Sequence, residues 1–518
     1  MAMHLTSVPV AREQAGVLAQ PDRRSVVLGG AAIGAAALCR PLAMAADPTP
    51  ADWQALRHRL STHELSLPGE PSYRKAHELF NPRFDRLKPA GIAYCAGHAD
   101  VSACLSFATK FRLPVRARAG GHSYAGWSSV TGGLIIDVSR INSFTAAGGT
   151  VTVGAGLDLI SLYGRLAALG LAVPGGSCPT VGLAGLTLGG GVGVLSRQYG
   201  LTSDNLQSLR IVTADGSVLT CDSTHNSDLF WASRGGGGGN FGVATSFTFQ
   251  AHPLPRLVRF FLIWPWSRAG SVVTAWQSWA PPAPQALWSN MHLSAAFGGP
   301  PQISVGGTYV GSLAGAHRLL NHLYAMVGAA PIFARVRSQS FLEVMLIEAG
   351  CLPTSSVKSC KAGAQRVPFF AKSDFFTSKL SGPGISALLA GIERLSGIAG
   401  AGGGAGSIAF DAFGGAINKV PADATAFVHR NALFLGQYYT SWNFPGSAAG
   451  VTRQHEWLRS FYADLHPHAS GQAYQNYVDP DLTDWRREYY GANYPRLQAV
   501  KAKYDPTGLF HFPQGITA

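Results

Sequence analysis

Three glycine-rich segments contain the residues of this chain that are best suited to chemistry. They are Arg116–Gly126, Pro174–Gly191 and Arg234–Gly242. Segments without side chains bring several backbone N–H groups to one point, and such groups bind phosphate or pyrophosphate. The first segment also holds His122 and the second holds Cys178, each a single nucleophile. The pattern predicts a large anionic ligand that lies beside two reactive side chains.

Simpler explanations stay open on residue types alone. Glycine runs also form tight turns without a ligand, a single His is usually a structural imidazole, and a single Cys is usually a small buried hydrophobe. None of the segments fits G-x-x-x-x-G-K-[ST], and none has G-x-G-x-x-G between a strand and a helix, which argues against a Walker-type triphosphatase and the standard dinucleotide fold. Neither C-x-x-C nor H-x-x-x-H accompanies His122 and Cys178, so no metal site is expected.

A second group of candidate residues lies near the C-terminus, in Tyr474-Gln475-Asn476-Tyr477. Aromatic packing of a strand is the ordinary explanation for two tyrosines at this spacing. A free phenol has a pKa of about 10 and is a poor base at neutral pH. Tyr477 would therefore need a neighbouring cation or hydrogen-bond donors before it could remove a proton from a substrate.

The elements that must position the glycine segments alternate between strands and helices over residues 90–250. One apolar face with helical spacing begins after Asp100. Strands are expected at 115–119, 134–138, 151–153 and 171–174, and a second helix at 157–169. This alternation predicts an α/β or α+β domain.

Residues 256–465 are richer in Trp, Phe and Pro. The stretches His292–Phe297 and Ile303–Val310 alternate, which predicts an antiparallel sheet with helices on one side. The glycine-rich stretch Gly400–Ser407 has no strand-then-helix context, so we expect a surface loop there.

Length and composition limit the class of protein. A chain of 518 residues with 47% hydrophobic residues favours a well-packed protein of two domains. The formal charge of +13 comes from scattered basic residues without a run of five, which excludes nucleic-acid binding and favours anionic cofactors and substrates.

The first 45 residues have the pattern of a signal peptide. Arg23-Arg24 precede the apolar run 26–38, and Ala43-Met44-Ala45 provides a small-residue cleavage site. The run is too short for a membrane anchor. The paired arginines predict twin-arginine export, a secreted or periplasmic destination and no membrane anchor. Such a destination permits a Cys351–Cys360 or Cys95–Cys104 disulfide, and buried free thiols are an equal alternative.

Several motifs together resemble one known family. They are Val115–Ser123, Gly175–Gly182, Gly189–Gly191, Tyr199–Asn205, Thr425–Arg430, Tyr474–Asp479, Tyr490–Leu497, Lys501, Lys503–Pro506 and Phe510. The sequence is similar, over about 90–255 and 410–516, to the berberine-bridge-enzyme-like oxidases of the vanillyl-alcohol-oxidase superfamily. This resemblance implies an α+β fold with a two-subdomain PCMH-type FAD-binding domain (46–255), a substrate domain with an antiparallel sheet flanked by helices (256–465), and a C-terminal segment that returns to the FAD domain (466–518).

The resemblance also implies roles for individual residues. It implies that FAD is bonded to His122 through the flavin 8α-methyl and to Cys178 through C6, and amide groups or positive charge near Cys178 would lower the pKa of its thiol. Tyr477 would be the catalytic base, Gln437 would point at the substrate, and Tyr124 would be a further catalytic candidate beside the flavin. The further residues expected at the cofactor are Arg118, Gly120, Gly121, Ser123, Val181, Gly182, Gly185, Gly189, Gly190, Gly191, Gly242, Val243 and Asn476.

The implied reaction is oxidation of an alcohol with hydride transfer to the flavin. Val181 follows Cys178 by three residues, and in the family valine at this position accompanies reactivity toward oxygen, so an oxidase that forms H2O2 is favoured over a dehydrogenase. Abundant tryptophan suits stacking on sugars, which makes the anomeric hydroxyl of an oligosaccharide the preferred target and a lactone the product. A secondary-metabolite or polyphenol alcohol is the runner-up, and a secreted carbohydrate-binding protein with a purely structural FAD is the third reading. We expect a monomer.

Overall fold

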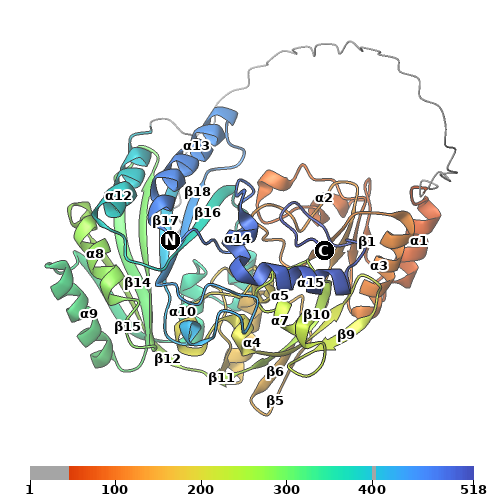
Figure 1. Cartoon of the computed structure of the whole chain (residues 1–518), viewed down its shortest axis with the longest axis horizontal. Coiled ribbons are helices and arrows are strands. Elements are labelled where there is room, and N and C mark those ends of the chain that lie inside the picture. The colour runs from red at the N-terminus through yellow and green to blue at the C-terminus, as the bar shows by residue number, and fades with distance from the viewer. Residues whose placement is uncertain (1–45, 399–403) are drawn as a thin grey trace, which may run out of the picture. The chain divides into compact units, whose positions relative to one another are not determined.

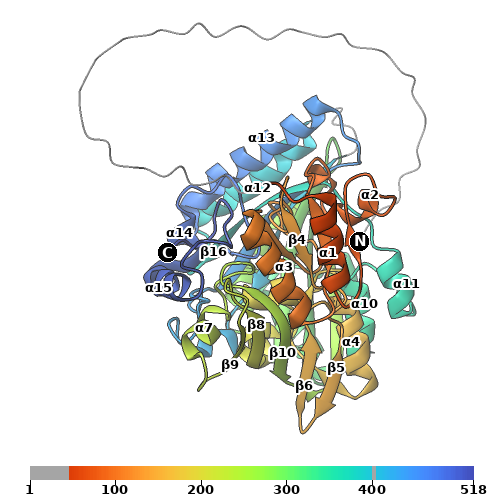
Figure 2. The ribbon, with the colours of Figure 1, turned by 90° about the vertical axis from the view of Figure 1, so that its right-hand side faces the viewer.

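The computed structural model describes residues 46–398 and 404–518, and the expected signal peptide at 1–45 lies outside these described residues. The first sheet is formed by strands buried on both faces, as is typical of parallel strands. Its strands, in order across the sheet, are β1 (Leu65–Ser66), β2 (Gly91–Tyr94), β4 (Leu134–Asp137) and β3 (Val115–Arg118). The last three are parallel, and Ile92 and Ile136 within them are fully buried. Beside them lie α1 (Pro50–Arg59), α2 (Tyr73–Ala76) and α3 (His98–Phe111) (Figure 2).

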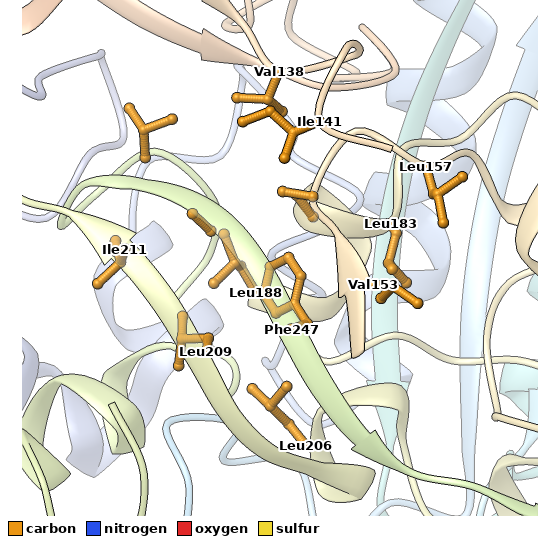
Figure 3. Packing of buried hydrophobic residues seen from close by; sticks show 14 of the residues in the cluster. Val138, Ile141, Val153, Leu157, Leu183, Leu188, Leu206, Leu209, Ile211 and Phe247 are labelled. Carbon is orange, nitrogen blue, oxygen red and sulfur yellow. The ribbon is translucent and has the colours of Figure 1, made fainter. Parts of the chain in front are cut away.

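A second, antiparallel sheet follows, with strand order β5 (Phe144–Ala147), β6 (Thr150–Gly154), β10 (Val243–Gln250), β8 (Leu206–Val212) and β9 (Val218–Cys221). Its connections contain α4 (Leu159–Ala168), α5 (Leu183–Leu188), α6 (Ser196–Tyr199) and α7 (Ser227–Ala232), and β7 (Leu171–Ala172) pairs with β11 (His252–Pro253). Figure 3 shows Phe247 of β10 packed among Val153 and Leu188, so one hydrophobic core joins this sheet to the helix that follows the Cys178 loop.

A third sheet has seven antiparallel strands, in the order β15 (Phe333–Ser340), β12 (Arg256–Trp264), β14 (Gln302–Val310), β13 (Leu287–Ala296), β17 (Ala405–Ala412), β18 (Phe434–Ser441) and β16 (Phe369–Phe376). On one face lie α8 (Ala269–Trp279), α9 (Leu313–Val327), α12 (Gly382–Ser396) and α13 (Ala448–Leu465) (Figure 1). The remaining α-helices of the described chain are α10 (Phe341–Glu348), α11 (Val357–Ala362), α14 (Trp485–Tyr490) and α15 (Tyr494–Tyr504).

The two faces of the seven-stranded sheet differ because side chains alternate along each strand. Phe260, Met291 and Phe410 belong to the core beneath the four helices, on what we call the helix face. On the opposite face, Leu257 and Trp288 pack into the core of the first two sheets. Farther along the same strands this opposite face becomes polar and partly exposed, and we call it the site face. The sheet therefore covers its own core with one face and presents polar groups with the other.

The predicted α+β fold and the antiparallel sheet with helices on one side are confirmed. The predicted elements also appear, with ends shifted by one to three residues: the helices as α3 and α4, and the strands as β3, β4, β6 and β7. The expected domain limits at 255 and 465 stay predictions, since Pro48–Ala518 forms one compact unit.

The expectation of a surface loop at Gly400–Ser407 is wrong for its last three residues, which begin β17. A side chain at Gly406 would lie 2.6 Å from the ring of Trp457. The glycine lets this ring pack against the strand, so it marks a close packing contact rather than a loop. Residues 399–403 lie outside the described residues.

Of the two cysteine pairs, Cys351 and Cys360 form a disulfide. Cys95 and Cys104 are buried free thiols whose sulfur atoms are 3.9 Å apart.

Candidate active site

The first glycine loop begins where β3 ends and presents unpaired amides. Within the described chain, the backbone N–H groups from Gly120 to Tyr124 donate to no protein acceptor. A Cβ at Gly120 would lie 2.3 Å from the backbone nitrogen of Gly182, so the first and second loops touch through their backbones. Gly121 has φ of +68°, a conformation that favours glycine. The loop is shaped to offer several donors to one anion.

His122 extends from this loop toward the second one. Its Nε2 lies 2.9 Å from Oγ1 of Thr180, and its ring stacks on Phe80 with centroids 4.0 Å apart. Burial lowers the pKa of His122 to about 4, so the imidazole is neutral at neutral pH. Among the described residues, Nδ1 has no hydrogen-bond partner. A neutral imidazole with one free nitrogen is a competent nucleophile.

Cys178 differs from the other free cysteines that the structure describes, because it is exposed while Cys95, Cys104 and Cys221 are buried. The amides from Gly175 to Cys178 donate to no acceptor within the described chain. The expectation of a lowered thiol pKa is nevertheless wrong. Surrounding protein raises the pKa of Cys178 above its ordinary value, since desolvation outweighs any stabilisation from the amides.

The third glycine loop is held by the C-terminal segment. Gln475 donates from Nε2 to the carbonyl of Gly235, and the Tyr490 hydroxyl donates to the carbonyl of Gly236 over 3.1 Å. The loop reaches α5 at Gly185, because a Cβ on Gly238 would lie 3.6 Å from the Gly185 Cα. The loop ends at Gly242, whose φ is +158°, and Val243 then begins β10.

The remaining residues expected at the cofactor occupy this same junction. Arg118 donates from Nε to Asp137 over 2.6 Å in a pair that is 5% exposed on each side, and its Nη1 is buried without a partner among the described residues. The Ser123 hydroxyl accepts from an amide in its own loop, and Val181 is partly buried. Gly190 and Gly191 both have positive φ.

Asn476 joins the C-terminal segment to α5. Its Nδ2 donates to the carbonyl of Leu186 and to the Tyr474 hydroxyl, each over 3.0 Å. That hydroxyl also accepts from the amide of Gly191. A Cβ on Gly189 would lie 2.0 Å from Asn476 Oδ1, so only glycine fits there.

The three expected catalytic residues come together although their sequence positions are far apart. Gln437 donates from Nε2 to the Tyr124 hydroxyl over 2.6 Å, and the ring of Tyr124 stacks on Tyr477 with centroids 5.3 Å apart and planes 6° apart. Tyr474 meets Tyr477 edge-on at 5.0 Å. Cys178 is close enough for its charge to raise the pKa of Tyr124 and of Tyr477.

The surroundings of Tyr477 do not favour a phenolate. Burial is the main cause that raises its pKa well above the ordinary value, and the charges of Tyr124 and Asp411 raise it further. No cation is among the causes. The neighbouring cation that Tyr477 would need as a base is therefore not supplied by the described residues.

Asp411 of β17 is a site residue that no motif in the sequence indicates. Burial raises the pKa of Asp411 to about 7, and the charge of Glu348 contributes to the same shift. The side chain is partly exposed on the site face, one strand from Gln437. A carboxylate with a pKa near 7 is well matched to accept a proton at neutral pH.

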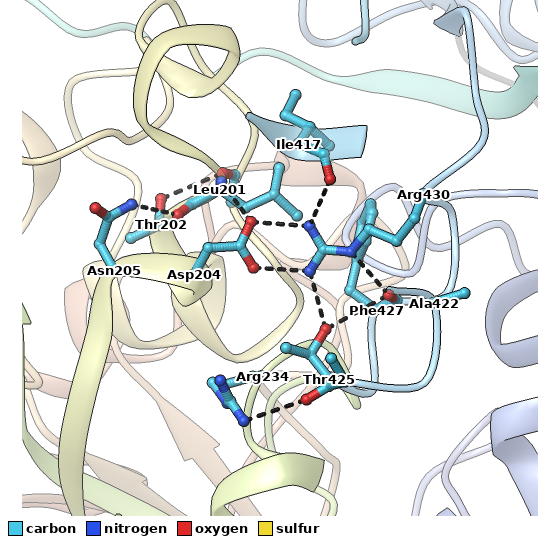
Figure 4. A network of polar contacts seen from close by, with 12 residues as sticks. Leu201, Thr202, Asp204, Asn205, Arg234, Ile417, Ala422, Thr425, Phe427 and Arg430 are labelled. Atoms are coloured by element: carbon cyan, nitrogen blue, oxygen red, sulfur yellow. Dashed lines mark hydrogen bonds and ion pairs between the residues drawn. The ribbon is translucent and has the colours of Figure 1, made fainter. Parts of the chain in front are cut away.

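A buried ion pair connects two more of the family-like motifs. Arg430 binds both carboxylate oxygens of Asp204, at 2.8 and 2.7 Å, and also contacts Thr425 and the carbonyl of Ile417 (Figure 4). The pair is 3% and 8% exposed. Asp204 in turn accepts from the amide of Leu201. This network fixes the segment after the Gly189–Gly191 run against the connection between β17 and β18.

These observations fit FAD. The free amides of two loops supply donors for a pyrophosphate, the buried Arg118 adds an unpaired guanidinium nitrogen, and the wall formed by Tyr124 and Tyr477 suits a flat ring system. No group of three or more metal-binding side chains occurs in the described ranges, and no helix there is long and apolar enough to span a membrane.

Comparisons with known proteins agree with this geometry. A family model described as an FAD binding domain matches residues 89–222, and one described as berberine and berberine like matches 473–517. The uncharacterized FAD-linked oxidoreductase YvdP of Bacillus subtilis is 34% identical over 461 residues, 88% of this chain and 98% of that protein. The berberine bridge enzyme-like D-1 of Nicotiana tabacum is 30% identical over 458 residues, 78% of each chain. The chain belongs to the berberine-bridge-enzyme-like FAD-linked oxidoreductases.

Two further members of this berberine-bridge-enzyme-like family are informative. The chitooligosaccharide oxidase of Gibberella zeae is 30% identical over 470 residues, 86% of this chain and 91% of that enzyme. The solved structure of Physcomitrella patens BBE-like 1 superposes with a TM-score of 0.81 at 29% identity, covering 89% of this chain and 98% of that one. The chain is thus an FAD-dependent oxidoreductase with the family fold.

The contact between Gly189 and Asn476 yields a prediction for this berberine-bridge-enzyme-like protein. Gly189→Ala should displace Asn476 and the adjoining Tyr477, because the added methyl group overlaps Oδ1. We expect at least a tenfold loss of turnover, measured with flavin content and circular dichroism on the same sample. Gly270→Ala is the control, since its nearest neighbour would lie at 3.8 Å. Full activity of Gly189→Ala would show that Asn476 is not needed in its present place.

Proposed function

We propose that the protein oxidises the anomeric hydroxyl of an oligosaccharide to a lactone and passes the electrons to O2. The balanced reaction converts the sugar and O2 into the lactone and H2O2. The observation that carries this proposal is the convergence of Tyr124, Gln437, Tyr477 and Asp411 beside the loops of His122 and Cys178. The similarity to a protein named chitooligosaccharide oxidase supports a sugar as substrate.

FAD, when bound, supplies the hydride acceptor. His122 and Cys178 would hold it by two covalent bonds, 8α-histidyl and 6-S-cysteinyl. A neutral imidazole and an exposed thiol on touching loops support this double attachment. The other positions of the glycine loops, with Arg118 and Asn476, would cradle the rest of the cofactor.

The proton of the substrate hydroxyl would go to Asp411. Its pKa of about 7 keeps a large share of the carboxylate ionised at neutral pH, whereas the pKa of Tyr477 lies far above. Tyr477 would position the substrate hydroxyl with its phenol, whose oxygen makes no hydrogen bond to another described residue. Tyr124, held by Gln437, would contact the substrate from a second side. The family resemblance implies Tyr477 as the base. We assign this role to Asp411 instead.

Two further parts of the proposal concern oxygen and location. Val181, partly buried next to the Cys178 loop, is the small side chain that would leave room for O2. The twin-arginine pattern in residues 1–45 would direct the folded, flavin-loaded protein to the periplasm or the outside of the cell. We expect a monomer.

A substrate panel tests the reaction. Neutral oligosaccharides should bleach the flavin absorbance without oxygen and yield H2O2 in air, in equal amounts to the lactone. If a polyphenol alcohol bleaches the flavin and sugars do not, the substrate is a polyphenol alcohol rather than a sugar. Bleaching without rapid reoxidation in air would make the protein a dehydrogenase. If no alcohol bleaches the flavin, the protein would instead be a carbohydrate-binding protein in which FAD is purely structural.

The double attachment has its own test. Flavin fluorescence should stay with the protein on a denaturing gel, and peptide mass mapping should find the added mass on the peptides of both His122 and Cys178. Cys178→Ala should keep the His122 bond only, and the variant lacking both side chains should release all flavin. Cys221→Ala, which removes a buried free thiol, is the matched control. Release of flavin from the unmodified protein on denaturation would refute covalent attachment.

The assignment of Asp411 as base predicts a specific pH dependence. Asp411 is protonated below its pKa of about 7, so kcat/KM should rise with pH through about 7 and then level off. Asp411→Asn should lower kcat by about 10²–10⁴-fold and abolish this rise. Glu348→Gln removes a charge that raises the Asp411 pKa, so the rise should move to lower pH with kcat largely kept. An unchanged pH profile in Asp411→Asn would assign the titration to another group.

A further inference from the structure

A row of paired residues crosses the site face from the candidate base to the open edge of the sheet. Asp411 pairs with Asn290, Asn290 with Gly306, Gly306 with Phe261, and Phe261 with Arg335. Directly paired residues in antiparallel strands project to the same face. We call these five residues the cross-strand row.

Four of the five residues of the cross-strand row are accessible, whereas the helix face behind Asp411, Asn290, Gly306 and Phe261 is closed. Phe261, Asn290 and Asp411 are partly exposed and Arg335 is exposed. Their neighbours on the helix face, Phe260, Met291, Val305 and Phe410, are at most 1% exposed. Gly306, in the middle of the row, is buried, and the Asn290 amide oxygen lies 2.6 Å from where its Cβ would stand, so the Asn290 side chain lies over the glycine.

Polar groups near the Asp411 end of the row lack protein partners. The side chains of Asn290 and His292, both partly exposed on β13, make no hydrogen bond within the described chain. Burial lowers the pKa of His292 to about 4, so it is neutral and offers one donor and one acceptor. Such groups suit the hydroxyls of a sugar.

The far end of the row has a different character. β15 is the edge strand, and its Arg335 and Arg337 are both exposed on the site face with no carboxylate within ion-pair distance among the described residues. Beside them, Phe261 and Phe333 meet edge-on at 6.3 Å, and Phe333 is 48% exposed. Two free guanidinium groups next to an aromatic surface provide charge for carboxylates and an apolar face for a ring.

Four strand spacings separate Asp411 from Arg335, which corresponds to about 19 Å. A ligand that reaches both ends must therefore be an oligomer. We propose that the cross-strand row, with Arg337, His292 and Phe333, binds an oligosaccharide that carries carboxylates on its distal sugars. This inference rests on the proposed sugar oxidation and adds the class of sugar: a uronic-acid chain whose anomeric end lies at Asp411.

The ordinary role of arginines on an edge strand is to prevent pairing with another sheet. That role requires charge at the edge but no alignment with the active site. The register places Arg335 in the same row as Asp411, and leaves polar side chains without partners between them. This alignment favours ligand binding along the row over a role limited to protecting the sheet edge.

Binding to the flavin-loaded enzyme tests the row without turnover. The probe is a tetramer of galacturonic acid whose anomeric end has been reduced to the alditol, and a reduced neutral cellotetraose is its uncharged counterpart. Calorimetry should show that the double variant Arg335→Gln with Arg337→Gln binds the acidic tetramer about tenfold more weakly. Its affinity for the neutral tetramer should change by less than about twofold. Binding of the acidic tetramer to the unmodified enzyme should weaken as salt is added. Monomeric galacturonate should bind at least about tenfold more weakly than the tetramer.

The control variant removes two charges elsewhere. Arg268 and Arg318 are exposed on the helix-covered side of the sheet, so Arg268→Gln with Arg318→Gln changes the net charge equally. An equal loss of acidic-tetramer binding in this control would show a general charge effect and overturn the proposal. Unchanged binding in the Arg335 and Arg337 variant would show that both residues only prevent the edge strand from pairing with another sheet. Equal affinity for monomer and tetramer would contradict the claim that the ligand extends along the whole cross-strand row.

These outcomes are separate from those of the proposed function. If the acidic tetramer binds through Arg335 and Arg337 but no sugar bleaches the flavin, the sugar oxidation fails and the binding row stands. If neutral sugars are oxidised and the acidic tetramer does not bind, the oxidation stands and the row fails.

Discussion

The backbone contact between Gly120 and Gly182 is the constraint on which the site depends. The two glycines belong to loops that follow different sheets, and no side chain of any size would fit between them. This contact brings His122 within hydrogen-bond distance of Thr180, two residues beyond Cys178. Because both loops leave their amides free, the same contact that aligns the two nucleophiles also gathers the donors for an anion.

The third sheet complements these loops by separating two tasks between its faces. The helix face buries large aromatic and aliphatic side chains beneath α8, α9, α12 and α13. The site face is thereby free to hold groups that would be costly in a core, such as Asp411 and the unpartnered His292. Rigid strands rather than loops hold these groups, and a strand keeps the spacing between them fixed.

The sequence predicted the parts of the site that local motifs specify. His122, Cys178, Asn476 and Tyr477 stand in short recognisable segments, and α3 and the alternating strands follow from apolar periodicity. Asp411 was missed because its place depends on the pairing of β13, β17 and β18, which are more than a hundred residues apart at their extremes. The pKa of Cys178 was expected in the wrong direction because desolvation by the surrounding protein depends on the whole fold, even for a side chain that stays exposed.

The contribution of the C-terminal segment has a consequence for biosynthesis. Gly191 donates to Tyr474, Leu186 accepts from Asn476, and the third glycine loop is held by Gln475 and Tyr490. A nascent chain that has emerged from the ribosome only as far as the second sheet therefore has its nucleophiles but not the supports of their loops. Cofactor capture must wait until translation is nearly complete, so the flavin enters a finished fold rather than a growing one.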